Sequence, residues 1–322
     1  MTDSFSPPDK SDSPGRRAGL VAIVGRANVG KSTLLNAILG EKVSIVSPVA
    51  QTTRSMIRGL VSDTRGQLVF LDTPGVHRAR YDLGRLMNMT ARAAVEGVDV
   101  VLLVVDVAAG PRLEDQGWMT RLARQTASVV VALNKTDLVT SAPVGVGRGD
   151  RESEYRAAWH RAAEGCPSTP DPRWVRVSAA TGLGVEDLVA LLFSMVPEGP
   201  LLFPEDMLSD YPRKLAIADV VREKFFLVLR EELPHCLAVC IETIQERPEG
   251  WTVSGEVYVN KDSQKGIVIG RKGALLAAVR RQAEGELSAV YERPVRIELR
   301  VKVRPNWSRD RVLLRKLGYL SD

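Results

Sequence analysis

The sequence predicts an N-terminal α/β domain, with a mostly parallel sheet and helices on both faces, followed by a smaller α+β domain. Short apolar runs such as Val100–Val105 alternate with helical periods in the first part, as expected for strands buried on both faces. In the last third, apolar and polar residues alternate over 237–245 and 251–259, which is typical of half-buried strands. The chain of 322 residues is long enough for two well-buried cores.

Composition divides the chain into four segments. The first segment, residues 1–17, is rich in Ser, Pro and Asp, and it lacks the apolar core of a signal peptide or an anchor. Pro197 and Pro200 flank Glu198 and Gly199 in a short polar linker. We therefore expect a disordered leader at 1–17, the α/β domain at 18–197, a linker at 198–202 and the second domain at 203–322.

The expected elements follow the apolar patterns. In the α/β domain, strands are expected at 20–24, 56–61, 68–71, 98–107, 128–133 and 174–177, and helices from about 31 and at 83–95, 118–124 and 185–195. Residues 140–172 have the composition of a surface insertion with one short helix at 154–163. In the second domain we expect helices at 206–230, 274–289 and 309–316, and a third strand at 295–303.

Composition and charge limit the class of protein. With 44% hydrophobic and 26% charged residues and no long apolar run, the chain has the composition of a globular protein that spans no membrane. Three cysteines without metal-ligand spacing fit a reducing, cytoplasmic location. Residues 261–322 hold 15 Lys and Arg against 7 Asp and Glu, although the whole chain carries only +5. Such a local excess predicts a polyanionic partner.

The segment 25–32, GRANVGKS, has the phosphate-binding spacing G-x-x-x-x-G-K-[ST] between a strand pattern and a helix pattern. Gly25 and Gly30 let the loop backbone curl around phosphate oxygens, with its N–H groups pointing inward. Lys31 is expected to reach the β- and γ-phosphates, and Ser32 to supply a Mg²⁺ ligand. The predicted phosphate-binding residues are Gly25, Asn28, Val29, Gly30, Lys31, Ser32 and Thr33.

A second motif, Asp72-Thr73-Pro74-Gly75, follows the strand at 68–71. Asp72 is placed to hold Mg²⁺ through water, and the Gly75 N–H to meet a γ-phosphate. The exposed loop before the strand at 56–61 carries a further Mg²⁺ ligand, for which Thr53 is favoured and Thr52 is the alternative. The predicted catalytic residues are Lys31, Thr53, Asp72 and Gly75, and the predicted metal ligands are Ser32, Thr53 and, through water, Asp72.

The tetrapeptide Asn134-Lys135-Thr136-Asp137 ends the strand at 128–133, where ligands of open α/β sheets bind. Guanine presents two donors on one edge, and the Asp137 carboxylate can accept both, whereas adenine presents an acceptor there. Ser178 and Ala179, at the end of the next strand, are placed to contact the base oxygen O6 through their backbone. Asn134, Lys135, Asp137, Ser178 and Ala179 are therefore the predicted base-binding residues, and they favour GTP over ATP.

The second domain carries Gly270-Arg271-Lys272-Gly273, which we expect to join an apolar turn to the helix at 274–289. This is the G-x-x-G loop of a KH domain, whose glycines admit a nucleic-acid backbone while basic residues meet its phosphates. The predicted RNA-binding residues are Lys265, Gly270, Arg271, Lys272 and Gly273.

Together GRANVGKS, QTT, DTPG, NKTD and SAA resemble the translation-factor class of GTPases, and GRxNVGKSTLLN with AQTTR and DTPGVH is similar to the Era family in particular. The resemblance implies a Ras-like GTPase domain and a type II KH domain. It further implies GTP/GDP and Mg²⁺ as ligands, and slow GTP hydrolysis by Mg²⁺-assisted in-line attack of water. The implied partner is the 3′ end of small-subunit ribosomal RNA, with a role in small ribosomal subunit maturation. We expect a cytoplasmic monomer that can make peripheral contact with the inner face of the cell membrane.

Two rival functions and one open role remain. The basic C-terminus could instead serve a membrane-surface switch at the inner face of the cell membrane, and the first domain could be a P-loop ATPase, against which Asp137 argues. Val76, after the DTPG motif, cannot orient an attacking water, so turnover should be slow. Asn28 either helps to hold K⁺ against the phosphates or braces the loop by hydrogen bonds. No metal other than Mg²⁺ and K⁺ is expected.

Overall fold

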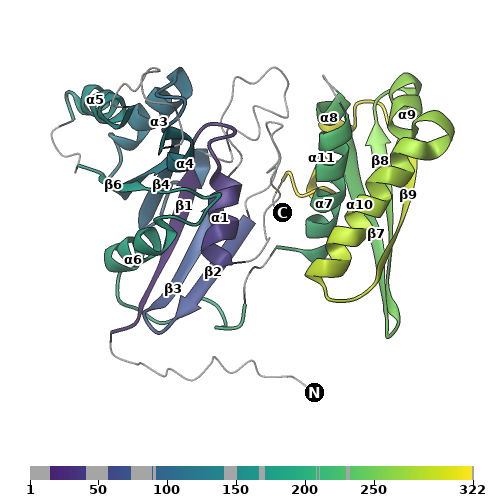
Figure 1. Cartoon of the computed structure of the whole chain (residues 1–322), viewed down its shortest axis with the longest axis horizontal. Helices are drawn as coiled ribbons and strands as arrows, with labels where there is room; N and C mark the ends of the chain where they lie inside the picture. Colours follow the sequence, from purple (N-terminus) through teal and green to yellow (C-terminus); the bar gives the residue numbers. More distant parts are fainter. Residues whose placement is uncertain are drawn as a thin grey trace.

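The computed structural model describes residues 15–40, 57–73, 89, 92–140, 151–166, 171–207, 209, 211–229 and 233–320. Figure 1 shows a sheet with helices on both of its faces beside a second group of helices and strands. The first part comprises β1 (Arg17–Val24), α1 (Lys31–Leu39), β2 (Ile57–Asp63), β3 (Gly66–Asp72), β4 (Val100–Asp106), α3 (Leu113–Leu122), β5 (Ser128–Asn134), α4 (Thr136–Thr140), α5 (Arg151–Ala163), β6 (Arg173–Arg176) and α6 (Val185–Met195).

The first sheet has six strands in the order β2-β3-β1-β4-β5-β6. All neighbouring pairs are parallel except β2 with β3, which form a hairpin. The register places Asp72 opposite Ile23 and Asp106 opposite Asn134. The polar residues that end the apolar strands therefore lie along one edge of the sheet, where ligands of this fold class bind.

Two apolar clusters cover the two faces of this sheet. Alternate residues of the central strands, among them Ile23 and Leu102, pack with α1 and α6, and their neighbours, such as Val24 and Leu103, pack with α3 and α5. This double burial explains why these strands are continuous apolar runs in the sequence.

Two helices of this domain differ from the sequence prediction. Helix α3 begins at Leu113 instead of Trp118, because the Asp115 carboxylate accepts the Arg112 N–H at 3.0 Å and caps the first turn. Helix α5 is longer than expected, and one of its faces packs in the core instead of lying entirely on the surface. Its Tyr155 and Trp159 are fully buried against the sheet. The expected helix at 83–95 lies largely outside the described residues.

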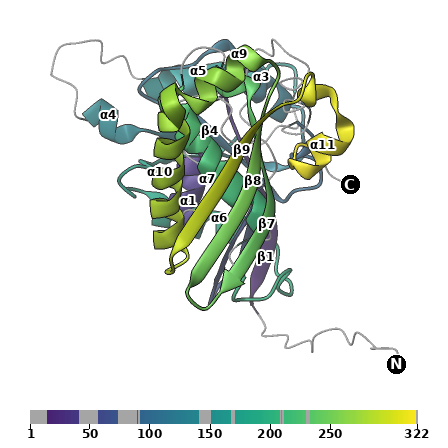
Figure 2. The ribbon, with the colours of Figure 1, turned by 90° about the vertical axis from the view of Figure 1, so that its right-hand side faces the viewer.

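The second part is a three-stranded sheet in the order β7-β8-β9, covered by α7 and α10. Side chains of β7 alternate between this core and a cluster with α11, so α10 and α11 lie on opposite sides of the strands (Figure 2). Its elements are α7 (Arg213–Val228), α8 (Leu233–Cys236), β7 (Ala238–Arg247), β8 (Gly250–Val259), α9 (Asp262–Ile269), the 3-10 turn η1 (Arg271–Gly273), α10 (Ala274–Val290), β9 (Val295–Val303), the 3-10 turn η2 (Trp307–Arg309) and α11 (Arg311–Lys316).

Three helix predictions in this part were inaccurate. The expected apolar turn before the G-x-x-G loop is the helix α9, whose start is capped by Gln264 Oε1 accepting the N–H groups of Asn260 and Lys261 at 2.9 and 3.1 Å. Helix α7 begins after Pro212 instead of at 206, since proline is favoured at a helix start. Helix α11 begins after its N-cap, Asp310.

None of the described helices is both long enough and apolar enough to cross a membrane.

Candidate functional site

The loop from Gly25 to Gly30 is shaped by close backbone packing. Gly25 has φ 147°, and a Cβ there would lie 2.4 Å from the Val104 carbonyl oxygen of β4. Gly30 has φ 97°, and a Cβ there would lie 2.4 Å from Asn134 Nδ2. Both positions therefore exclude side chains, and the loop turns into α1 with Lys31 as the first helical residue. A helix N-terminus of this kind favours negative charge and is suited to binding an anion.

Lys31 lies inside this loop. Its Nζ donates to the carbonyl oxygens of Gly25 at 3.2 Å and Arg26 at 3.0 Å. Burial lowers the pKa of Lys31 from 10.5 to about 8, against the opposing charge of Asp72. The ammonium group is thus held among carbonyls, beside the turn where phosphate would sit.

The lowered pKa of Lys31 predicts that GTP binding takes up protons at about pH 8. Phosphate charge raises the pKa of a neighbouring ammonium group, so binding restores the proton that the free protein has begun to lose. Affinity should then weaken by up to about tenfold per pH unit above pH 8. Calorimetry in two buffers of different ionisation enthalpy measures this uptake, with GMP, which lacks the β- and γ-phosphates, as the control ligand. Proton-neutral GTP binding at pH 8 would show that Lys31 does not meet the phosphates.

Ser32 and Asp72 come together as the sequence predicts. Ser32 Oγ donates to Asp72 Oδ2 at 2.9 Å, and Asp72 is fully buried at the end of β3. Thr73 Oγ1 donates to the Ile23 carbonyl at 2.8 Å and fastens this strand end to β1. Two oxygen donors beside a phosphate loop suit Mg²⁺, which prefers oxygen ligands. The predicted residues Thr52, Thr53, Gly75 and Val76 lie outside the described residues.

Asn134 joins three loops. It is buried, its Nδ2 donates to the Val29 carbonyl at 2.8 Å, and its Oδ1 accepts the Ala179 N–H at 2.9 Å. Lys135, with φ 67°, donates from Nζ to the Asn28 carbonyl at 2.9 Å and to Asp106 Oδ2 at 2.7 Å. These two side chains thus fix the predicted base-binding loop after β5 to the loop from Gly25 to Gly30.

Asp137 is the second residue of the short helix α4 and contacts the loop after β6 through Ser178. Ser178 Oγ donates to Asp137 Oδ1 at 2.6 Å, and Ser178 is fully buried. Asn134 also binds the backbone of Ala179, so the predicted base-binding residues of both loops lie within one hydrogen-bonded group. Such a group presents a carboxylate whose orientation is set before a base arrives.

A buried polar network beneath the phosphate loop was missing from the sequence analysis. Arg26 Nε donates to Asp115 Oδ2 at 3.1 Å, and its Nη2 lies 3.8 Å from Asp106 Oδ2. Asp106 also accepts the N–H groups of Ala108 and Ala109, both at 3.1 Å. Burial raises the pKa of Asp115 above its usual range. The sequence feature that could have revealed this network is Asp106, because its carboxylate ends an apolar strand as that of Asp72 does.

The loop predicted to bind RNA is exposed and basic. Lys272 and Gly273 have φ 51° and 80°, and no residue of the turn Arg271–Gly273 is buried. A Cβ at Gly270 would lie 2.6 Å from Leu275 Cβ, whereas one at Gly273 would meet nothing within 4 Å. Over the described part of the chain, no carboxylate lies within ion-pair distance of Arg271, Lys272 or Lys265, which precedes them on α9. Their charges are available to phosphates.

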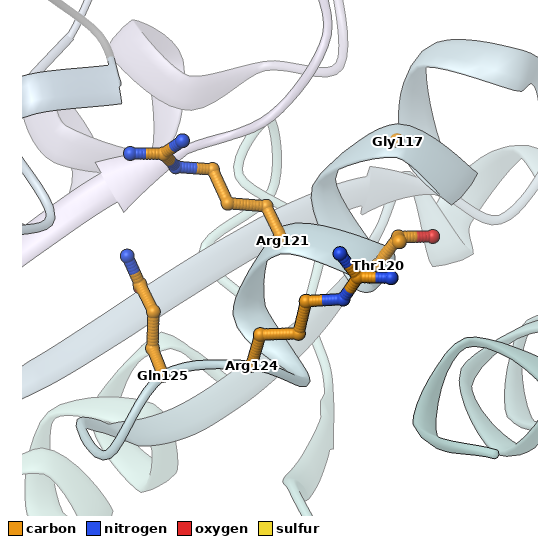
Figure 3. A pocket seen from close by; sticks show the side chains of 5 residues that line it. All are labelled: Gly117, Thr120, Arg121, Arg124 and Gln125. Carbon is orange, nitrogen blue, oxygen red and sulfur yellow. The ribbon is translucent and has the colours of Figure 1, made fainter. Parts of the chain in front are cut away.

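A separate hollow of about 410 Å³ lies on α3, lined by Gly117, Thr120, Arg121, Arg124 and Gln125. Figure 3 shows the Arg124 guanidinium beside Thr120, with Arg121 pointing the other way. Arg121 donates to the Arg92 carbonyl at 3.2 Å and pairs with Glu96 at 3.5 Å. None of the predicted site residues lines this hollow.

Comparison with known proteins identifies the family. The family of 50S ribosome-binding GTPases matches residues 20–135, and the KH domain family matches residues 232–308. The GTPase Era of Geobacter metallireducens is 41% identical over 311 residues, which cover 96% of this chain and 99% of that protein. The chain belongs to the Era family of GTPases. The GTPase Era of a Nostoc species is 36% identical, over 95% of this chain and 90% of its own.

Solved structures agree with this assignment. A crystal structure of Era in complex with MgGDPNP and nucleotides 1506–1542 of 16S ribosomal RNA superposes with a TM-score of 0.84 at 36% identity, over 95% of this chain and all of that one. Aquifex aeolicus Era bound to GDP·AlF4⁻ gives a TM-score of 0.82. The predicted fold class, a P-loop GTPase domain followed by a KH domain, is confirmed, and so is the prediction that this chain is a GTPase.

Proposed function

We propose that this Era-family GTPase couples GTP binding and slow hydrolysis to recognition of the 3′ end of small-subunit ribosomal RNA, and thereby assists maturation of the small ribosomal subunit. The proposal is supported by the presence, in one chain, of hydrogen bonds that join the predicted base-binding residues around Asn134 and of an exposed basic turn at Arg271 and Lys272. A similar chain was solved with a nucleotide analogue and a 16S fragment together.

The nucleotide site supplies charge stabilisation. The N–H groups from Asn28 to Thr33 and the Lys31 ammonium hold the phosphates, and they stabilise charge that develops on the γ-phosphate as water attacks in line. Asp137 accepts the two guanine donors, while Ser178 and Ala179 meet the base oxygen. Hydrolysis yields GDP and phosphate.

Ser32 is the direct protein ligand that we assign to Mg²⁺, with Asp72 acting through water. Thr53, with Thr52 as the alternative, is proposed as the second ligand. The ion would neutralise phosphate charge.

The KH domain supplies RNA recognition. Gly273 leaves open space in front of the turn, so a phosphate backbone can approach it closely. Arg271, Lys272 and Lys265 add charges that meet phosphates, and single-stranded RNA of about four nucleotides fits such a clamp. We propose a cytoplasmic monomer.

A direct binding experiment tests this function. Fluorescence anisotropy with a labelled RNA copy of the small-subunit 3′ end should give saturable binding that competitor RNA of shuffled sequence does not displace. Flotation with anionic liposomes tests the membrane-surface rival in parallel. Liposome binding without RNA binding would reject the RNA proposal in favour of the membrane switch.

Potassium should accelerate hydrolysis if Asn28 helps to hold a monovalent cation. Asn28 is exposed on the phosphate loop with φ 63°, and a cation there would stabilise charge between the β- and γ-phosphates. We expect basal turnover near or below about 10⁻³ s⁻¹ and stimulation by K⁺ over Na⁺ at equal ionic strength. Asn28→Ala should remove the difference between the salts. Equal rates in both salts, or stimulation that survives in the variant, would leave Asn28 as a brace of the loop.

A further inference from the structure

The segment that connects the two domains, residues 198–207, is hydrogen-bonded to the GTPase domain through Gln67. Gln67 lies on β3 and is fully buried. Its Oε1 accepts the N–H groups of Leu202 and Phe203, both at 2.9 Å, and its Nε2 donates to the Phe203 carbonyl at 3.0 Å and to Ser62 Oγ at 3.0 Å. One amide side chain thereby satisfies all its hydrogen-bonding positions, and three of its four bonds go to the connecting segment.

Apolar contacts continue this docking along the β2–β3 hairpin. Phe203 and Met207 pack against a small cluster of Leu60, Val69 and Leu71 on the two strands. Beyond the segment, Ser209 forms an isolated antiparallel bridge with Gly59 of β2. The described residues Leu202, Phe203, Met207 and Ser209 are therefore all bound to, or packed against, the hairpin.

The hairpin includes Asp72 of the predicted nucleotide site, and Ser209 bridges it to the chain that leads into the KH domain. The register pairs Ile57, the first residue of β2, with Asp72, the residue that accepts from Ser32. Thr52 and Thr53 precede β2 by a few residues in the sequence. Ser209 is only four residues before Arg213, where the first KH helix, α7, begins. A displacement of the hairpin on exchange of GTP for GDP would therefore also move the docked connecting segment, and with it the start of α7.

We propose that Gln67 is a positioning residue that makes RNA affinity depend on the bound nucleotide, by clamping residues 202 and 203 to the β2–β3 hairpin. The inference rests on the proposed function, since it requires that the chain binds both GTP and RNA. It does not place Gln67 in contact with either ligand.

Gln67→Met removes the amide while keeping an unbranched side chain of similar length. Ser62→Ala is the matched control, because it removes the only bond of Gln67 that does not reach the connecting segment. Leu202→Pro removes the backbone N–H of residue 202, which is one of the two donors to Gln67 Oε1, and it changes no residue of β3. Hydrogen exchange of the 198–207 peptide reports the docking, and the ratio of RNA affinities with a GTP analogue and with GDP reports the coupling. The RNA probe is the synthetic small-subunit 3′ end.

Exchange should rise about tenfold or more at residues 202 and 203 in Gln67→Met, and at residue 203 in Leu202→Pro, because proline has no amide hydrogen. The ratio of RNA affinities should fall to about one, whereas GTP affinity stays within about twofold of wild type. Ser62→Ala should keep both wild-type values. Faster exchange with an unchanged ratio would overturn the inference, and so would a wild-type ratio of one. Wild-type protein that binds no RNA would instead contradict the proposed function, while the exchange data would still report whether Gln67 holds the segment.

Discussion

Replacing Asp137 with Asn is expected to weaken guanine nucleotide binding by about 10²- to 10⁴-fold and to improve binding of xanthine nucleotides. Ser178 Oγ donates to Asp137 Oδ1, so an amide at this position would turn its oxygen to Ser178 and its NH₂ group to the base. The NH₂ group then faces the two donors of guanine, whereas xanthine offers it an acceptor. Titration with fluorescent GDP and XDP measures both effects.

Ser178→Ala is the matched control for this exchange. It removes the hydrogen bond that orients Asp137 but leaves the carboxylate in place. We expect a smaller loss of affinity and an unchanged preference for guanine over xanthine. Wild-type GTP affinity in Asp137→Asn would mean that the base is read elsewhere.

Gly273→Asp should reduce RNA affinity by about 10²-fold or more and leave GTP affinity unchanged, because like charges that face each other across an interface cost several kcal/mol. Gly273 is better suited to this test than Gly270. A Cβ at Gly273 meets open space, and Asp adopts a φ of 80° at a lower cost than most other residues do, whereas a Cβ at Gly270 would collide with Leu275. Anisotropy with the labelled RNA at several salt concentrations measures the loss.

Gly273→Asn separates charge from bulk in this experiment. Asn also tolerates a left-handed backbone and has the size of Asp, so a large loss only in the Asp variant identifies phosphate repulsion. Lower salt should tighten wild-type binding steeply, since phosphate contacts release counterions. RNA binding by Gly273→Asp at the wild-type level would place the clamp outside this turn.

Elements with strong local signals were predictable from sequence. Strands β4 and β5 are continuous apolar runs, and the motifs at Asp72 and Asn134 follow strand ends, so topology alone brings them to one edge. Helix α9 was missed because Gly266 interrupts its pattern, and its start depends on a cap from Gln264.

Contacts between distant segments were not predictable. Asn134 was predicted to bind the base, yet its side chain donates a hydrogen bond to the Val29 carbonyl, which lies 105 residues away in the sequence. Arg26 meets Asp115 across 89 residues, and Gln67 meets Phe203 across 136. No local period or motif records such pairs, because each depends on the completed fold.

RNA binding through the Gly270–Gly273 turn is measured in cells by a crosslinking map of the RNA bound to this protein, made with wild type and with Gly273→Asp. Wild-type crosslinks should concentrate at the 3′ end of small-subunit ribosomal RNA, and the variant should lose them. Crosslinks spread evenly over cellular RNA, or a 3′-end signal that persists in Gly273→Asp, would contradict this expectation.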